Sequence, residues 1–165
     1  MKKVALHNLG CKVNAYETEA MQHLLEEAGY EIVPFTQKAD VYVINTCSVT
    51  NMADRKSRQM LHKAKKNNPD SIVVAAGCYV QTSEKEVLND LSVDIVIGND
   101  RKHDLVRLLE EYSLDSVNDT VDDINDGKHD FEELFIDQTK EHTRAFIKVQ
   151  DGCNYYCTYC TIPFA

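Results

Sequence analysis

Short apolar runs alternate with helical patterns along the first 112 residues, and this alternation most narrows the folds open to the chain. Two of the runs, 41–45 and 71–76, are apolar almost without interruption. Such runs are typical of strands in a parallel sheet that is covered on both faces. Strands alternating with helices predict an α/β domain with a parallel sheet and right-handed crossovers. The five predicted strands are 2–8, 30–34, 41–45, 71–76 and 94–97.

The segments between these strands carry signals for helices. Asn14 lies three residues before Glu17, the spacing of a capping box, and Gly29 follows the last periodic residue of that segment. Thr50 or Asn51 is expected to cap a second helix that ends before Pro69, and further helices are expected at 83–90 and 102–111. Five strand–helix units in about 110 residues favour the flavodoxin-like order 2-1-3-4-5, with helices on both faces.

The chain is expected to divide into three parts. Residues 1–112 form the α/β domain, and residues 113–142 form an acidic linker, since 118–128 carries many acids and lacks apolar periodicity. Residues 143–150 alternate like a strand that enters a second domain, so 143–165 is predicted to be its start. The sequence stops five residues after its last cysteine, which suggests the N-terminal part of a longer polypeptide.

The charge and the cysteine content of the chain restrict its expected partners and its expected location in the cell. The chain has 27 acidic and 18 Lys or Arg residues, a formal charge of −9, so a phosphate-binding surface is not expected from the overall balance. Basic residues concentrate between Arg55 and Lys66, where a solvated helix face is the favoured interpretation over an RNA contact. No apolar run approaches the roughly 20 residues needed to cross a bilayer, and no signal peptide is evident. Six cysteines in a chain without a signal peptide predict a cytoplasmic protein whose thiols serve metal or redox chemistry.

The last fifteen residues contain three cysteines at the spacing CxxxCxxC, namely Cys153, Cys157 and Cys160. Three thiolates on a short loop can hold a cubane iron–sulfur cluster and leave one iron without a protein ligand. A structural zinc site would need a fourth ligand. A zinc loop that lacks this ligand and buried cysteines without metal are the alternatives.

Three further cysteines, Cys11, Cys47 and Cys78, each lie one to three residues past the end of a predicted strand. These strands are the first, third and fourth, which are neighbours in the order 2-1-3-4-5. Ligands of doubly wound domains bind beyond the carboxyl ends of such strands. We therefore expect the three thiolates to converge on a second cluster. Ordinary core cysteines and a thiolate catalyst with a redox partner are the alternatives.

Several motifs, in their order along the chain, resemble the methylthiotransferases of the radical S-adenosylmethionine superfamily. They are Gly10-Cys-Lys-Val-Asn14 with Glu17-Thr-Glu19, Asn45-Thr-Cys-Ser-Val-Thr50, Ala76-Gly-Cys78, and Gln150-Asp-Gly-Cys153 with Cys157, Cys160 and Pro163. The wording of the first two motifs is most similar to the branch that acts on N6-threonylcarbamoyladenosine 37 of tRNA. The alternatives are the branches acting on isopentenyladenosine in tRNA and on a ribosomal protein.

The resemblance implies two 4Fe-4S clusters and S-adenosylmethionine as cofactors. Cys153, Cys157 and Cys160 would hold the cluster that cleaves S-adenosylmethionine to a 5′-deoxyadenosyl radical, and Tyr159 would lie against that cofactor. Cys11, Cys47 and Cys78 would hold the auxiliary cluster, which carries the sulfur inserted at adenine C2. No side chain is assigned as a catalytic acid or base.

The same resemblance implies partners and missing parts. The partners are a tRNA substrate and an electron donor such as a flavodoxin or ferredoxin, while the oligomeric state stays open. A radical barrel and a basic RNA-binding module would follow the present residues and make most of the tRNA contact, so this portion alone is expected to be inactive. An iron–sulfur carrier of flavodoxin-like shape and a zinc-binding interaction module are the rival classes. Asn14, Glu17, Glu19 and Asn45 are either groups that orient the cysteine loops or ordinary caps and turns.

Overall fold

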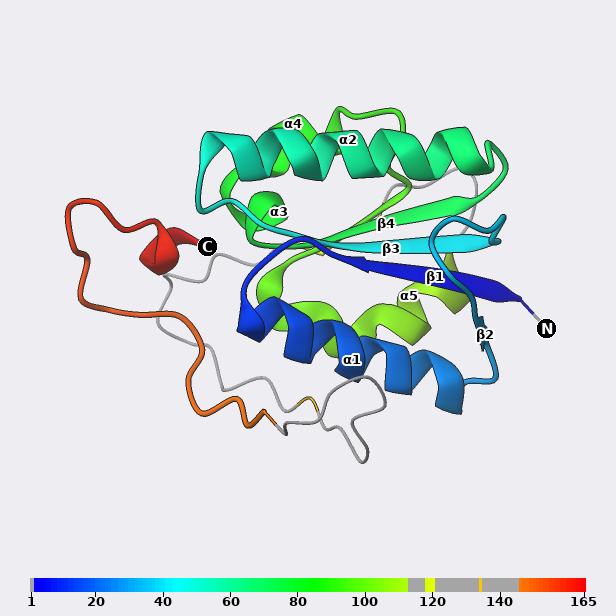
Figure 1. Ribbon diagram of the computed structural model, residues 1–165, viewed down its shortest axis with the longest axis horizontal. Coiled ribbons are helices and arrows are strands. Elements are labelled where there is room, and N and C mark those ends of the chain that lie inside the picture. The colour runs from blue at the N-terminus through cyan, green and yellow to red at the C-terminus, as the bar shows by residue number, and fades with distance from the viewer. Residues whose placement is uncertain (1, 113–117, 121–133, 135–145) are drawn as a thin grey trace.

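The computed structural model describes residues 2–112, 118–120, 134 and 146–165, and these form a parallel sheet flanked by helices (Figure 1). The sheet has the order β2-β1-β3-β4-β5-β6, and every neighbouring pair is parallel. The predicted α/β class and the order 2-1-3-4-5 of the first five strands are therefore confirmed. The strands are β1 (Lys3–Asn8), β2 (Glu31–Ile32), β3 (Val41–Thr46), β4 (Ile72–Gly77), β5 (Ile95–Ile97) and β6 (Asn118–Thr120).

Helices cover both faces of the sheet. Figure 1 shows α1 and α5 on one side and α2, α3 and α4 on the other. A six-residue 3₁₀ helix, η1, leads into α5, and a second one, η2, lies near the end of the chain. The bounds are α1 (Lys12–Glu27), α2 (Asn51–Asn67), α3 (Cys78–Thr82), α4 (Glu84–Leu88), η1 (Asn99–Asp104), α5 (Leu105–Glu111) and η2 (Ile162–Phe164).

The central strands feed two hydrophobic cores, because alternate side chains of a strand point to opposite faces. In β3, Tyr42 and Ile44 join the core beneath α2, whereas Val41 and Val43 join the core beneath α1 and α5. All six residues of β3 are buried. This double burial explains why the central strands read as continuous apolar runs in the sequence.

Helix α1 begins differently from the prediction. Cys11, not Asn14, occupies the N-cap position, and its side chain makes no capping bond. Asn14 lies inside the first turn and is 3% exposed, because its amide nitrogen donates to the last two residues of β3, Asn45 and Thr46. Thr50 caps α2 as predicted, since its hydroxyl accepts a bond from the amide of Ala53. Helix α3, which starts at Cys78, was not predicted, because five residues are too few to show helical periodicity.

The later residues also depart from the expected pattern. Part of the stretch predicted as a linker, Asn118–Thr120, forms β6 and extends the sheet beside β5. The rest of that stretch lies almost entirely outside the described residues, so the linker stays a prediction. Residues 146–150 were expected to be part of a barrel strand, yet they have no strand pairing. A strand needs a hydrogen-bonded neighbour, and the described residues offer none at this position, so the barrel strand stays a prediction.

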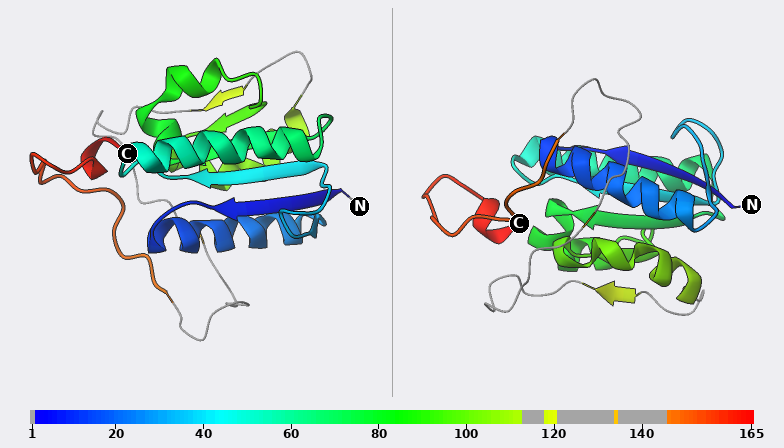
Figure 2. Two further views of the ribbon diagram at one scale, coloured as in Figure 1. Left: turned by 45° about the horizontal axis from the view of Figure 1, so that its top comes forward. Right: turned by 90° about the horizontal axis from the view of Figure 1, so that it is seen from below.

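The segment 146–165 passes beyond the carboxyl ends of β1 and β3, on the side where α1 and α2 begin (Figures 1 and 2). This placement brings the second group of cysteines toward the same end of the sheet as the first. Among the residues that the structure describes, no helix is long and apolar enough to cross a membrane.

Candidate metal centre at the carboxyl edge of the sheet

Cys11, Cys47 and Cys78 lie just past the ends of three neighbouring strands. Cys47 follows β3 directly, Cys78 follows β4 directly, and Cys11 lies three residues past the end of β1. The strand ends are level with one another, because Asn8 pairs with Asn45 and Thr46 pairs with Gly77. The fold thus brings these three sequence-predicted residues to one edge.

The thiols of Cys11 and Cys47 act electrostatically on the thiol of Cys78. Burial raises the pKa of the Cys78 thiol, the ammonium group of Lys102 lowers it, and Cys47, Glu17 and Cys11 raise it. The net effect is a raised pKa. An electrostatic effect of both other thiols on Cys78 requires that they lie within its range.

All six cysteines are free thiols in the described chain, with Cys47 buried, Cys11 exposed and Cys78 half-buried. Within the described residues, no three His, Cys, Asp or Glu side chains are arranged to hold a single metal ion. A four-iron cluster is larger than one ion, so its ligand sulfurs lie further apart than the ligands of a single ion. Ligation by these residues therefore stays a proposal, based on their shared edge and their electrostatic coupling.

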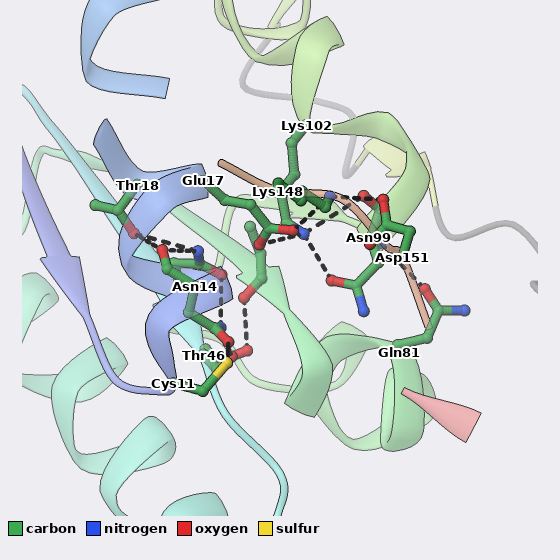
Figure 3. Close-up of polar contacts among 12 residues, drawn as sticks. Cys11, Asn14, Glu17, Thr18, Thr46, Gln81, Asn99, Lys102, Lys148 and Asp151 are labelled. Carbon is green, nitrogen blue, oxygen red and sulfur yellow. Dashed lines mark hydrogen bonds and ion pairs between the residues drawn. The ribbon is translucent and has the colours of Figure 1, made fainter. Parts of the chain in front are cut away.

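Two buried asparagines, Asn14 and Asn45, hold the cysteine loops together, and Figure 3 shows Asn14 beside Cys11 and Thr46. The Cys11 thiol donates to Asn14 Oδ1 at 3.2 Å, and Asn14 Nδ2 donates to Asn45 Oδ1 at 3.2 Å and to the carbonyl of Thr46 at 3.0 Å. Asn45 Nδ2 in turn donates to the carbonyl of Asn14 at 3.0 Å and to Thr18 Oγ1 at 3.2 Å. Bonds between buried amides fix geometry, because an unmade bond would leave a desolvated polar group. The Asn14–Asn45 pair therefore joins the loop of Cys11 to the loop of Cys47.

Glycines allow the asparagines to pack this closely. A Cβ at Gly10 would lie 2.7 Å from Asn14 Cγ. Gly77 has φ of 95°, and a Cβ there would contact Asn45 Oδ1 and lie 2.5 Å from the carbonyl oxygen of Thr46. Because Gly77 directly precedes Cys78, the Asn45 contact brings the third cysteine loop into the same cluster of contacts.

The Cys47 loop has its own support from α2. The amide of Cys47 donates to Ser57 Oγ at 3.3 Å, and the Ser57 hydroxyl donates back to the carbonyl of Cys47 at 3.1 Å. Ser57 is fully buried. On the exposed side, the Thr82 hydroxyl of α3 donates to the carbonyl of Cys78 at 3.0 Å and lies within hydrogen-bond distance of Ser48 Oγ, at 2.8 Å. Each of the three loops is thereby held by side chains from neighbouring elements.

Four charged side chains lie next to this edge in alternating order of sign, and we call them the charged chain: Lys102, Glu17, Lys148 and Asp151 (Figure 3). Glu17 Oε2 lies 2.8 Å from Lys102 Nζ, and Glu17 Oε1 lies 3.0 Å from Lys148 Nζ. Lys148 Nζ contacts Asp151 Oδ2 at 2.5 Å. Lys102 also donates to Asn99 Oδ1 at 2.8 Å. The charged chain runs from the vicinity of Cys78 to a residue two positions before Cys153.

The charges of Glu17 and Lys148 stabilise each other. Burial raises the pKa of Glu17, but Lys102 and Lys148 lower it more strongly together, so the net pKa lies below the ordinary value of 4.5. Burial lowers the pKa of Lys148, and Glu17 and Asp151 raise it, so its net pKa lies above 10.5. Both groups are therefore ionised at neutral pH.

The lowered pKa of Glu17 predicts an acid dependence of stability. A carboxyl group with a folded pKa below its unfolded pKa stabilises the fold above the unfolded value and loses this contribution as pH falls through the folded value. We expect the difference in unfolding free energy between the wild type and Glu17→Gln to be constant near neutral pH and to shrink below about pH 4.5. Urea unfolding at a series of pH values measures this, with exposed Glu31→Gln as control. A difference that does not change with pH would contradict the ion pairing of Glu17.

Cys153, Cys157 and Cys160 lie on an open loop at the other end of the charged chain. Cys157 is exposed, Cys153 and Cys160 are half-buried, and the amide of Cys160 donates to the carbonyl of Cys157 at 2.9 Å in a tight turn. Tyr159, predicted to lie against a cofactor, is 91% exposed, so its face is available. No interaction among the described residues tests the ligand role of these cysteines, which stays a prediction.

The basic residues of α2 are partly occupied within the domain. Arg58 Nη1 donates to the Tyr79 hydroxyl at 3.0 Å, and Lys65 Nζ contacts Asp94 Oδ2 at 2.6 Å. These contacts tie α2 to α3 and to the residue that precedes β5. Exposed basic residues remain at Arg55, Lys56, Lys63 and Lys66.

Fold and site together define a doubly wound α/β domain that carries three cysteines at the carboxyl edge of its sheet. A CxxxCxxC loop follows this domain. Residues 3–98 match the model of a family described as "Uncharacterized protein family UPF0004". The chain belongs to this family, since the match covers more than half of it. The predicted resemblance to methylthiotransferases is confirmed by its similarity to individual proteins.

The chain is 46% identical over all of its length to the threonylcarbamoyladenosine tRNA methylthiotransferase MtaB of Bacillus subtilis, and 43% identical over 99% of its length to that of Aquifex aeolicus. A tRNA-2-methylthio-N(6)-dimethylallyladenosine synthase of Ehrlichia canis is 32% identical over 99% of the chain. The chain spans 37%, 40% and 38% of these three relatives. The higher identities agree with the branch predicted from the sequence motifs.

Proposed function

We propose that the protein to which this chain belongs inserts a methylthio group at C2 of N6-threonylcarbamoyladenosine 37 of tRNA. The observation that carries the proposal is 46% identity over the whole chain to a protein named for that activity. The six cysteines at one end of the sheet agree with it. The present residues are proposed to supply both cysteine sites and not the complete enzyme, because they span 37% of that relative.

The donor set fits two 4Fe-4S clusters, since thiolates are the ligands of such clusters and all six cysteines are free. Cys11, Cys47 and Cys78 would hold one cluster, and Cys153, Cys157 and Cys160 would hold the other. When bound, the clusters would supply an electron for cleavage of S-adenosylmethionine and a site for the transferred sulfur.

The described side chains have definite tasks in this proposal. The Asn14–Asn45 pair and Ser57 hold the loops of Cys11 and Cys47, and Gly77 lets the loop of Cys78 approach them. Lys102 places a buried positive charge near Cys78, which favours the thiolate form that a metal ligand requires. Tyr159 presents an exposed aromatic face beside the second loop, suited to packing against S-adenosylmethionine.

The proposed partners follow from this chemistry. The substrate is a tRNA, contacted mainly by parts of the protein beyond these residues, because the present portion carries a net charge of −9. The electron donor is a small redox protein such as a flavodoxin or ferredoxin. A cytoplasmic location is proposed because six free thiols persist in a reducing compartment.

Iron content separates the two cysteine sites. After anaerobic reconstitution of the whole protein we expect about eight irons per chain, the content of two four-iron clusters. Replacing Cys11, Cys47 and Cys78 together by Ala should leave about four irons and retain cleavage of S-adenosylmethionine, but abolish methylthio transfer. Replacing Cys153, Cys157 and Cys160 should also leave about four irons but abolish cleavage. Gln59→Ala, at an exposed position of α2, is the control and should keep all of the iron.

Other results would favour the rival classes. Stoichiometric zinc without cleavage of S-adenosylmethionine would indicate a zinc-binding interaction module. Iron–sulfur clusters without cleavage would indicate a carrier or electron-transfer protein. The substrate branch is tested by mass spectrometry of tRNA nucleosides from a deletion strain. Loss of the methylthio group on threonylcarbamoyladenosine is expected, whereas an unchanged nucleoside profile would overturn the proposed substrate.

A further inference from the structure

The side chain of Lys148 is covered by the domain, although Lys148 lies between two exposed apolar residues. Its side chain is 3% exposed, whereas Ile147 and Val149 are 83% and 85% exposed. This is the reverse of ordinary burial, in which apolar side chains are covered and lysines are solvated. The segment that leads to the CxxxCxxC loop therefore rests on the domain through a charge and not through an apolar face.

The partner of this lysine is built into the domain. Glu17 on α1 is 4% exposed, and Lys102 on η1 is 1% exposed. Lys102 already neutralises the charge of Glu17. The positive charge of Lys148 is therefore balanced by a second carboxylate, that of Asp151. The four charges of the charged chain alternate and sum to zero. A neutral set of this kind can be buried, whereas any one of these charges alone would be strongly disfavoured.

The two ends of the charged chain lie near different cysteine sites. Lys102 acts electrostatically on Cys78, and Asp151 is separated from Cys153 by Gly152 alone. The side-chain amide of Gln150 donates to the carbonyl of Gly152 at 2.8 Å, which fixes the backbone between them. The charged chain is thus a continuous set of ion pairs from Lys102, which acts electrostatically on one cysteine site, to Asp151, which lies two positions before the other (Figure 3).

We propose that Glu17 and Lys148 are positioning residues that hold the loop of Cys153, Cys157 and Cys160 at a fixed place relative to the edge of Cys11, Cys47 and Cys78. The purpose of this placement rests on the proposed function, in which both sites act on one carbon atom of the substrate. Reactions between held groups are sensitive to small displacements, so a loose second loop would waste cleavage of S-adenosylmethionine. The contact itself does not depend on that function.

Two other contacts also reach α1 from the later residues. The Tyr16 hydroxyl donates to the carbonyl of Leu134 at 2.7 Å, and Lys12 Nζ lies 5.9 Å from the ring centre of Phe146. Both lie earlier in the chain than Lys148, so they cannot fix the residues next to Cys153. Breaking the pair of Glu17 and Lys148 should therefore release the segment around position 148 while α1 and the sheet stay folded.

Trypsin cleavage after Lys148 measures this release, because the protease must take the lysine side chain into its own pocket. Cleavage of a transiently opened site follows the population of the open form. In the whole protein we expect Glu17→Gln to accelerate cleavage at the 148–149 bond by roughly tenfold to a hundredfold, since it removes a buried partner. Exposed Lys56→Met on α2 is the control and should leave the rate unchanged.

A second variant covers the case in which Glu17→Gln weakens the domain itself. Asp151→Asn removes the counter-charge outside the domain and leaves Glu17 and Lys102 paired. It should also accelerate cleavage after Lys148, with no change in the thermal midpoint of the sheet. Cleavage rates equal to the wild type in both variants would overturn the proposal.

The functional consequence has a separate readout. With both clusters reconstituted, Lys148→Met should keep its iron and its cleavage of S-adenosylmethionine. Its methylthio product per cleaved S-adenosylmethionine should fall at least about tenfold. A variant that couples the two steps as well as the wild type would refute the positioning role. If the wild type itself makes no methylthio product while the trypsin result holds, the proposed function fails and the contact stands.

Discussion

Gly77→Ala should destabilise the domain by about 4 kcal/mol, because the added Cβ meets both a backbone conformation reserved for glycine and backbone atoms of the neighbouring strand. The backbone of Gly77 has φ of 95° and ψ of −168°, a region that residues with a Cβ essentially do not adopt. The added Cβ would also lie 2.5 Å from the carbonyl oxygen of Thr46 and 2.9 Å from its amide nitrogen. Neither backbone atom can move without breaking the pairing of β3 with β4.

Urea unfolding of the wild type and the variant measures this loss. Gly29→Ala is the matched control, because Gly29 also has a positive φ, 84°, but a Cβ there would meet no atom within 4 Å. We expect the control to lose only about 1 kcal/mol, the cost of the backbone conformation alone. Equal losses in the two variants would mean that the contact with Thr46 and Asn45 does not matter. The variant should also lose iron from the first cysteine site, since Cys78 follows Gly77 directly.

The α/β architecture was largely predictable, because a strand that is buried on both faces of a sheet appears in the sequence as a continuous apolar run. Runs such as 41–45 must be apolar throughout when both sides of a strand are covered, and so the central strands were located almost to the residue. The edges were harder. Strand β2, predicted over 30–34, has only two residues, and β6, which has three, was not predicted because it lies within a stretch whose acidity indicated a linker.

The cysteine edge was predictable for a related reason. Carboxyl ends of parallel strands meet at one edge, so the strand order alone placed Cys11, Cys47 and Cys78 together. The side chains that hold the cysteine loops were harder to predict, because a contact between residues far apart in sequence leaves no local pattern. Asn14 has the spacing of a helix cap, and only the fold shows that its amide reaches Asn45, 31 positions away.

The charged chain lay beyond sequence reasoning altogether. Lys148 occupies a polar position in an alternating stretch, which indicates the solvent face of a strand. Its burial depends on Glu17, 131 positions earlier, and Glu17 had a sufficient local explanation as a capping-box residue. A buried lysine is rare enough that a local pattern predicts the opposite. Such pairs can be found only once the fold has placed their partners.

Asn45→Ala should cost about 3 kcal/mol, because it leaves several buried polar groups without partners. Asn45 is fully buried, and its amide bonds the carbonyl of Asn14, the hydroxyl of Thr18 and the amide of Asn14. The truncated side chain would also leave a cavity beside Gly77. Unfolding in urea measures the loss, and Asn89→Ala is the control, since Asn89 is exposed and its side chain donates to the nearby carbonyl of Lys85 on the surface. The control should change stability by at most about 0.5 kcal/mol.

The same variant separates support of the cysteine loops from general stability. Cys11 is held through Asn14, whose amide would lose its Asn45 partner and keep only the carbonyl of Thr46. The whole protein carrying Asn45→Ala should therefore bind about four irons fewer than the wild type after reconstitution, even well below its unfolding temperature. Full iron content in a folded Asn45→Ala variant would show that the cysteines reach their ligand geometry without the asparagine pair. Loss of iron from the first site alone, with cleavage of S-adenosylmethionine retained, is the result that the geometry requires.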